Sequence, residues 1–438
     1  MSLKRYFDLP RLRNVSSRAV LACALLFVVG MALLGSAKIA GGFYIASLLL
    51  GLYLLWRLPR VRIVVPPAVK LYLGSYLAFV ALVLAHIVVL STSTSHIDQV
   101  SRIGLGLLSC FTFLALFGFS REKLFGFAVL VAAAHAVVAV SVALWQGVDF
   151  ASLSLTAERA HGVTNPIPFS EMLATSIGVV ALAIAGRIDS RWLWGPLGLL
   201  ALVVGLGAFA VFLTGTRGTL LGFLLLFFLL WIVLLGRMKL WLAAVVTLPA
   251  AALVLAAGSF LLERDAATAS TLIDLLSATN ATDYRDDSIG IRLQLWSHAR
   301  DLIAEAPLLG HGIGSFPEVL RAPELGVPDD SILFTFSNVH NQYLDMTMKM
   351  GLVGATLFFL PLAVAFGVGL RLALDPATRD EGLAIIWVGG SYAIYGLTQT
   401  FYGHASTTLH FGVYLGMLMW LAPGGSYGDV RQPPETVS

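Results

Sequence analysis

The chain has 438 residues, of which 58% are hydrophobic and 12% are charged. This composition excludes an ordinary soluble domain and indicates a polytopic membrane protein, because no soluble core needs so much apolar sequence. The net charge of +3 does not imply a nucleic acid partner. Cys23 and Cys110 both lie in apolar segments, and they indicate neither a disulfide nor a metal site.

About twelve apolar segments are long enough to cross a bilayer, which takes roughly 20 residues. We expect helices, because lipid offers backbone polar groups no partner outside the helix. The predicted fold is therefore all-α, with nine membrane helices over 1–262, a large external loop over 263–339 and three helices with a tail over 340–438. The predicted spans are 19–35, 39–56, 68–90, 103–119, 124–146, 167–186, 192–213, 218–236, 240–262, 348–370, 382–402 and 405–422.

Basic residues indicate the orientation of these spans. Lysines and arginines collect in alternate connections, for example around Arg60, Lys123 and Arg371, and are sparse in the others. By the positive-inside rule both ends of the chain lie in the cytoplasm, and 263–339 lies outside. The segment 19–35 ends in a sequence like a signal-peptide cleavage site, but its apolar run is long for a signal, so we expect it to be retained.

Arginines in the external connections are candidates for binding an anion. Arg217 lies in a short turn between two spans, and its flanking glycines leave room for a phosphate oxygen to reach the guanidinium. The alternative is an arginine that only extends to the membrane surface. The hydroxyl of the preceding Thr216 is a further candidate for substrate binding. Arg159 and His404 lie in other external connections and are weaker candidates for substrate binding.

The external loop contains a predicted helix over 291–306, in which apolar residues recur at helical spacing. Arg292 lies on the same face as these apolar residues, and a charge on an inward face needs an anionic partner. A glycine-rich turn follows over 307–314. Its His311 is a possible ligand contact, although a histidine in a turn is most often only part of that turn.

His340 and Asn341 stand at the start of the next predicted helix. Gly351 and Gly354 return to the face of His340 at about 100° per residue, so we expect a second helix to approach there. An imidazole at this boundary can accept a proton from a hydroxyl held at the membrane surface. Asn341 offers a donor and an acceptor beside it. The alternative interpretation is an interfacial histidine that caps a helix.

The sequence lacks a phosphate-binding loop, a zinc-binding His-Glu-x-x-His pair and an Asp-x-Asp pair. An external face also has no ATP or nucleotide sugars, so group transfer there needs a donor that is already activated. A lipid-linked pyrophosphate fits, because arginines can stabilise its leaving group without metal while a base deprotonates the acceptor hydroxyl. We therefore predict no cofactor and no metal.

Three motifs together resemble the O-antigen ligase and polymerase superfamily. His340-Asn341 followed by Gly351-x-x-Gly354 is similar to its His-[Asn/Ser/Gln]-x₉-Gly-x-x-Gly pattern. Ser288-x-x-x-Arg292-x-x-x-Trp296, leading into Pro307-Leu308-Leu309-Gly310, resembles a segment of its large periplasmic loop, and Thr216-Arg217-Gly218 resembles its [Ser/Thr]-Arg-Gly turn. The match covers about 200–360 in order, spacing and predicted side.

This resemblance implies a GT-C-like, inverting and metal-independent enzyme of the bacterial inner membrane, with its active site facing the periplasm. Undecaprenyl pyrophosphate would carry the donor glycan, and lipid A–core would be the acceptor. Carried over residue by residue, His340 would be the base, while Arg217 and Arg292 would hold the pyrophosphate. One dominant loop favours a ligase over a polymerase. A transporter is the alternative from another class, although no repeated half is visible.

Overall fold

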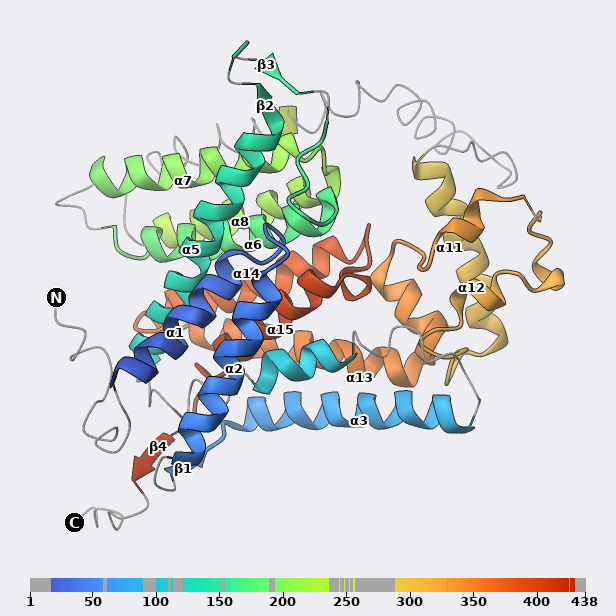
Figure 1. The fold of residues 1–438 in the computed structure, drawn as a ribbon, viewed down its shortest axis with the longest axis horizontal. Helices are drawn as coiled ribbons and strands as arrows, with labels where there is room; N and C mark the ends of the chain where they lie inside the picture. Colours follow the sequence, from blue (N-terminus) through green and yellow to red (C-terminus); the bar gives the residue numbers. More distant parts are fainter. Residues whose placement is uncertain are drawn as a thin grey trace.

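In a computed structural model, the chain is described at residues 17–57, 61–89, 100–108, 112, 121–149, 151–152, 154–156, 158–188, 194–235, 244, 248, 252, 255–256, 288–328, 330–424 and 426–429. Seven of the described helices are long and apolar enough to cross a membrane, which confirms a helical membrane protein. They are α2 (Ala40–Arg57), α3 (Pro67–Val89), α5 (Arg121–Gly147), α6 (Pro166–Ala185), α7 (Trp194–Leu213), α8 (Arg217–Leu235) and α13 (Gln342–Ala373) (Figure 1).

The described part of the chain does not confirm twelve spans. Helices α1 (Ser17–Ala32), α14 (Arg379–Tyr395) and α15 (Ala405–Met419) are shorter, with 16, 17 and 15 residues. The predicted spans 103–119 and 240–262 lie mostly outside the described residues. The predicted span 382–402 is too long at its end, because α14 stops at Tyr395 and a polar connection follows.

Helix α6 forms the centre of the bundle. It packs against α5, α7, α8, α14 and α15, and its residues are buried on all sides, as expected of a helix with no face toward solvent or lipid. Gly178 lets the Trp387 ring of α14 lie directly against it, and the indole Nε1 donates to the Thr175 carbonyl at 2.7 Å. This contact fixes α14, whose C-terminal end leads into the site described below.

Helix connections that the charge pattern assigns to the same side of the membrane lie at the same end of the bundle. At one end, β1 (Val61–Val64) pairs antiparallel with β4 (Ser426–Asp429), and Arg121 Nε lies 3.8 Å from Glu381 Oε1. The other end joins the α1–α2, α5–α6 and α7–α8 connections, where the amides of Val163 and Ala160 donate to the carbonyls of Gly35 and Leu213, each at 3.0 Å. The short hairpin of β2 (Val148–Asp149) and β3 (Ser154–Leu155) projects from that end (Figure 1).

The described part of the segment 263–339, which the charge pattern predicts to be external, forms a small unit with its own core beside the start of α13 (Figure 1). It comprises α11 (Ser288–Glu305), α12 (Phe316–Val319) and the 3₁₀ turns Pro323–Leu325 and Ile332–Thr335. The apolar face of α11 is buried, as the helical spacing predicts, and Trp296 donates from Nε1 to the Val339 carbonyl at 2.9 Å. Met348 of α13 belongs to this core, so α11 and α13 are held together.

Helix α13 is interrupted at Gly351, which has φ of 62° and ψ of −175°. The Pro307–Gly312 turn enters the break, and its carbonyls at Pro307 and Leu308 accept from the amides of Leu352 and Val353 at 2.9 and 3.2 Å. The amides of His311 and Gly312 donate in turn to the carbonyls of Met348 and Lys349. A helix break leaves such groups without partners, and this turn supplies them.

The predicted role of Gly351 is therefore corrected, whereas at Gly354 a side chain of a second helix, Leu82 of α3, does lie close, 3.2 Å from where a Cβ would be. A Cβ at Gly351 would lie 2.2 Å from the Leu308 backbone, so the glycine admits a loop and not a second helix. His340 also precedes α13 and is not helical, so the face count at 100° per residue does not apply to it.

We expect Gly351→Ala to lower the stability of the protein by about 3 kcal/mol, since only glycine readily adopts this conformation and the added methyl overlaps backbone. Gly367→Ala is the matched control, because Gly367 lies in the same helix with open space around it. Thermal unfolding in detergent measures both variants. Equal melting temperatures would contradict the role of the break.

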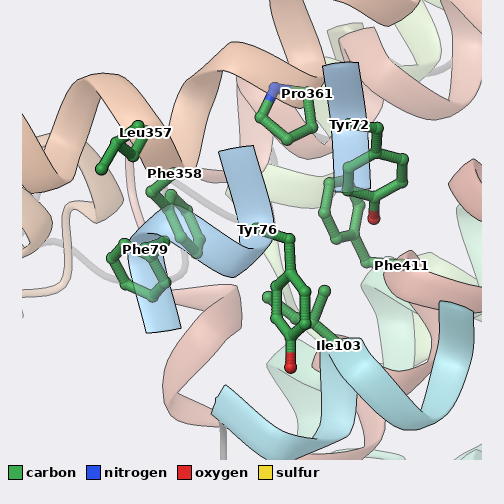
Figure 2. Close-up of a pocket in the computed structure, with 8 residues that line it drawn as sticks. All are labelled: Tyr72, Tyr76, Phe79, Ile103, Leu357, Phe358, Pro361 and Phe411. Atoms are coloured by element: carbon green, nitrogen blue, oxygen red, sulfur yellow. The ribbon is translucent and has the colours of Figure 1, made fainter. Parts of the chain in front are cut away.

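Aromatic side chains from α3, α13 and α15 surround a small pocket (Figure 2). Phe358 of α13 lines it and packs on Phe401 and Tyr402, with ring centroids 6.1 and 5.3 Å apart. Phe401 and Tyr402 belong to the α14–α15 connection. This aromatic packing therefore supports the connection, whose polar side chains are described in the next subsection.

Candidate active site

His340 lies in a strained turn directly before α13. Its φ of 53° makes it the one described residue other than glycine with a left-handed backbone. Such strain persists only when neighbouring contacts over-determine it, and it concentrates at functional positions. Asn341 is the N-cap of the helix: its Oδ1 accepts from the amides of Tyr343 and Leu344 at 3.0 and 3.1 Å.

Hydrogen bonds join this turn to the α14–α15 connection. The amide of Gln342 donates to the Gly396 carbonyl at 2.7 Å, and its side-chain oxygen accepts from the Tyr402 amide at 3.0 Å. Asn338 Oδ1 accepts from the Thr400 hydroxyl at 2.5 Å and from the His340 amide at 3.1 Å. The imidazole is therefore held on a rigid support made of two chain segments.

The imidazole of His340 has a defined tautomer. Its Nδ1 lies 2.5 Å from Gln399 Oε1, and the same oxygen accepts from the Thr400 amide at 3.1 Å. Because a backbone N–H can only donate, this atom of Gln399 must be the oxygen, and Nδ1 must carry the proton. Nε2 then holds the free electron pair that a base requires.

The surroundings of His340 keep it neutral. Burial is the largest cause that lowers its pKa below the ordinary 6.5, and the positive charge of Arg292 lowers it further. The Gln399 hydrogen bond and the charge of Asp345 raise the pKa but do not reverse the shift. Asp345 itself forms an ion pair with Lys349 at 2.8 Å. At neutral pH the imidazole can therefore accept a proton.

Three arginines from separate elements gather near this imidazole. Burial and the charge of Arg217 lower the pKa of Arg159, while burial and the charges of Arg217 and Arg159 lower the pKa of Arg292. Arg292 in turn acts on His340. Arg159 is anchored by a 2.6 Å bond from Nε to the Thr214 carbonyl, which fixes it beside the turn that carries Arg217. The charges that lower the pKa values of Arg159 and Arg292 are thus those of other arginines.

His404 belongs to the same cluster, at the end of the α14–α15 connection. Burial is the main cause that lowers the pKa of His404 to about 4, and the repulsion between two protonated imidazoles, His404 and His340, acts in the same direction. It is therefore uncharged at neutral pH and suited to hydrogen bonds with a neutral group.

Three other predicted substrate-binding residues have structural partners. The hydroxyl of Thr216 is buried and donates to Ser170 Oγ of α6 at 2.8 Å. His311 Nε2 lies 2.9 Å from the Leu302 carbonyl, within the turn that fills the break in α13. Asn341 caps α13 with its oxygen and donates from Nδ2 to the Leu397 carbonyl at 3.1 Å. We leave these three out of the proposed site.

Gln399 is the functional candidate that sequence reasoning missed. It lies within the predicted span 382–402, where the surrounding apolar residues conceal the polar run Thr398-Gln399-Thr400. That run, which begins two residues after Gly396, was the available signal that the helix ends before residue 402.

The fold and the site together define a helical membrane protein with a cluster of arginines and a neutral histidine at one end of its bundle. Residues 200–359 match the family model described as O-antigen ligase. This match supports the resemblance of that segment to the O-antigen ligase family, which the motifs also carry.

A protein of Haemophilus influenzae, described as an uncharacterized protein, is 23% identical over 259 residues. The aligned region covers 56% of this chain and 63% of that relative.

Proposed function

We propose that this chain is an O-antigen ligase that moves a glycan from undecaprenyl pyrophosphate to a sugar hydroxyl of lipid A–core, on the periplasmic face of the bacterial inner membrane. The observation that carries the proposal is the cluster of Arg159, Arg217 and Arg292 beside a neutral His340. Three like charges held together raise the free energy of the empty site, and a bound diphosphate offsets that repulsion.

The reaction follows from the chemistry of these groups. The acceptor hydroxyl attacks the anomeric carbon of the glycan, and its proton passes to Nε2 of His340. A bond from the acceptor oxygen to this carbon forms as the bond from the carbon to the pyrophosphate oxygen breaks. The electron pair leaves with undecaprenyl pyrophosphate, whose charge the guanidinium groups stabilise. Attack opposite the leaving group inverts the anomeric configuration.

The remaining cluster residues have supporting roles in this proposal. Arg217, at the first turn of α8, and Arg292, on α11, bind the diphosphate from two sides of the site. Arg159 adds a third cation that its bond to Thr214 keeps in position. His404 is uncharged and near His340, so it is suited to hydrogen-bond a sugar hydroxyl.

Reconstitution in vesicles tests the proposed reaction. Purified protein is supplied with undecaprenyl pyrophosphate glycan and with lipid A–core, and the products are separated by size and by lipid. Glycan attached to the core supports the ligase. Elongated glycan on the carrier lipid identifies a polymerase, and movement of lipid across the vesicle without transfer identifies a transporter; both results contradict the proposal.

We expect transfer to need neither a divalent cation nor ATP, because the arginines supply the positive charge and the donor is already activated. Rates measured with excess chelator and without nucleotide should stay within about twofold of the untreated rate. Addition of magnesium after chelation serves as the control. Loss of transfer in chelator, restored by magnesium, would overturn the proposed chemistry.

A further inference from the structure

We infer that Gln399 is the positioning residue of the site, which holds His340 so that Nε2 faces the acceptor hydroxyl. This inference rests on the proposed function and adds a residue outside the 200–359 family match. Gln399 does not touch the reacting atoms in this proposal; it acts through the imidazole.

The Gln399 side chain is itself fixed. It is 3% exposed, and its oxygen receives both the imidazole Nδ1 and the Thr400 amide. The backbone N–H of Gln399 donates to the Tyr395 carbonyl at 3.0 Å, so the residue is tied to the end of α14. Without this acceptor the imidazole can exchange its proton between the two nitrogens, and the population with a free Nε2 falls.

The choice of an amide over a carboxylate has a physical reason at this position. The charged and titratable groups that act on the ring are Arg292 from α11, Asp345 from α13 and His404 ahead of α15. A carboxylate at position 399 would raise the pKa of the imidazole and attract the arginines that the diphosphate needs. An amide oxygen orients the ring and adds no charge, so the cluster stays available for an anion.

The test compares two substitutions in reconstituted transfer assays. Gln399→Leu removes the acceptor of the imidazole N–H and should lower kcat about 10- to 100-fold, because a poorly oriented base loses part of its contribution to the rate. The KM for donor should stay within about threefold of wild type. Gln399→Glu keeps an acceptor at the same reach and adds a charge that favours the imidazolium. Only neutral His340 accepts a proton, so kcat/KM falls at low pH, and we call this fall the acidic limb of its pH profile. In Gln399→Glu the acidic limb should move to higher pH by about 1–2 units.

Thr400→Val is the matched control. It removes the bond from the Thr400 hydroxyl to Asn338, which joins the same two segments without touching the imidazole. This variant should keep the wild-type position of the acidic limb. Size-exclusion elution and melting temperature verify the fold of each variant, and Gln399→Glu provides the test if the leucine variant does not fold.

A wild-type kcat for Gln399→Leu, or an unmoved acidic limb for Gln399→Glu, overturns the positioning role. A shift of the limb in Thr400→Val would also overturn it, because the effect would then come from the connection and not from the imidazole contact. Failure of the proposed function is distinguishable, since in that case the wild-type protein itself attaches no glycan to lipid A–core.

Discussion

Replacement of His340 by alanine is expected to lower transfer by about 10²- to 10⁴-fold, the range that general base catalysis contributes. The acceptor hydroxyl would lose the nitrogen that takes its proton, while the arginines that bind the donor would remain. The loss should therefore appear in kcat far more than in the KM for donor. Single-turnover assays with the lipid-linked donor measure it.

His340→Asn tests the same role without the backbone problem that alanine brings. His340 has a φ of 53°, and asparagine tolerates this region better than most residues. His298→Ala is a matched control from α11, in the unit beside the start of α13, and should transfer within about threefold of wild type. Wild-type rates for both His340 variants would remove the residue as the base.

The proposed base also sets a pH dependence. Burial and Arg292 hold the pKa of His340 below 6.5, and the neutral form is the active one. Transfer should therefore be constant near neutral pH and fall as the pH drops through this lowered value. A decline that begins above pH 7 would contradict the assignment.

Substitution of Arg217 or Arg292 by lysine should lower kcat/KM about 10- to 100-fold, because a point charge does not reproduce the bidentate fork that binds a phosphate. Substitution by glutamine should cost more, about 10²- to 10³-fold, since the leaving-group charge then loses a partner. Arg300→Lys is the control on α11: Arg300 is exposed and pairs with its neighbour Asp301. Transfer assays at saturating acceptor measure all of these variants.

The same cluster predicts an unusual effect on stability. Arg292 is repelled by Arg217 and Arg159 in the absence of an anion. Arg292→Gln should therefore melt at the same temperature as the wild-type protein or above it, even though transfer is lost. A clear drop in melting temperature would indicate that Arg292 serves the fold and not an anion.

Much of the candidate site could be predicted because its residues are unusual where they occur. The sequence places five such residues in connections that it predicts to be external, where basic and titratable groups are sparse, and the structure brings them together: Arg159, Arg217, Arg292, His340 and His404. Their side of the bundle follows from the charge pattern, since connections assigned to one side do meet.

The parts that could not be predicted depend on backbone conformation. The spacing of Gly351 fits a helical face, and only its positive φ reveals a break that a distant turn fills. Hydropathy averaged over a span likewise conceals the end of α14 and with it Gln399. The hydroxyl of Thr216 and the amide of Asn341 look available in sequence, but packing and capping engage both of them.

A structure determined with undecaprenyl pyrophosphate glycan bound would test the central claim most directly. The diphosphate is expected within hydrogen-bond distance of Arg159, Arg217 and Arg292, with Nε2 of His340 facing the side of the anomeric carbon opposite the leaving oxygen. A diphosphate at the other end of the bundle, near Arg121 and Glu381, would contradict the account.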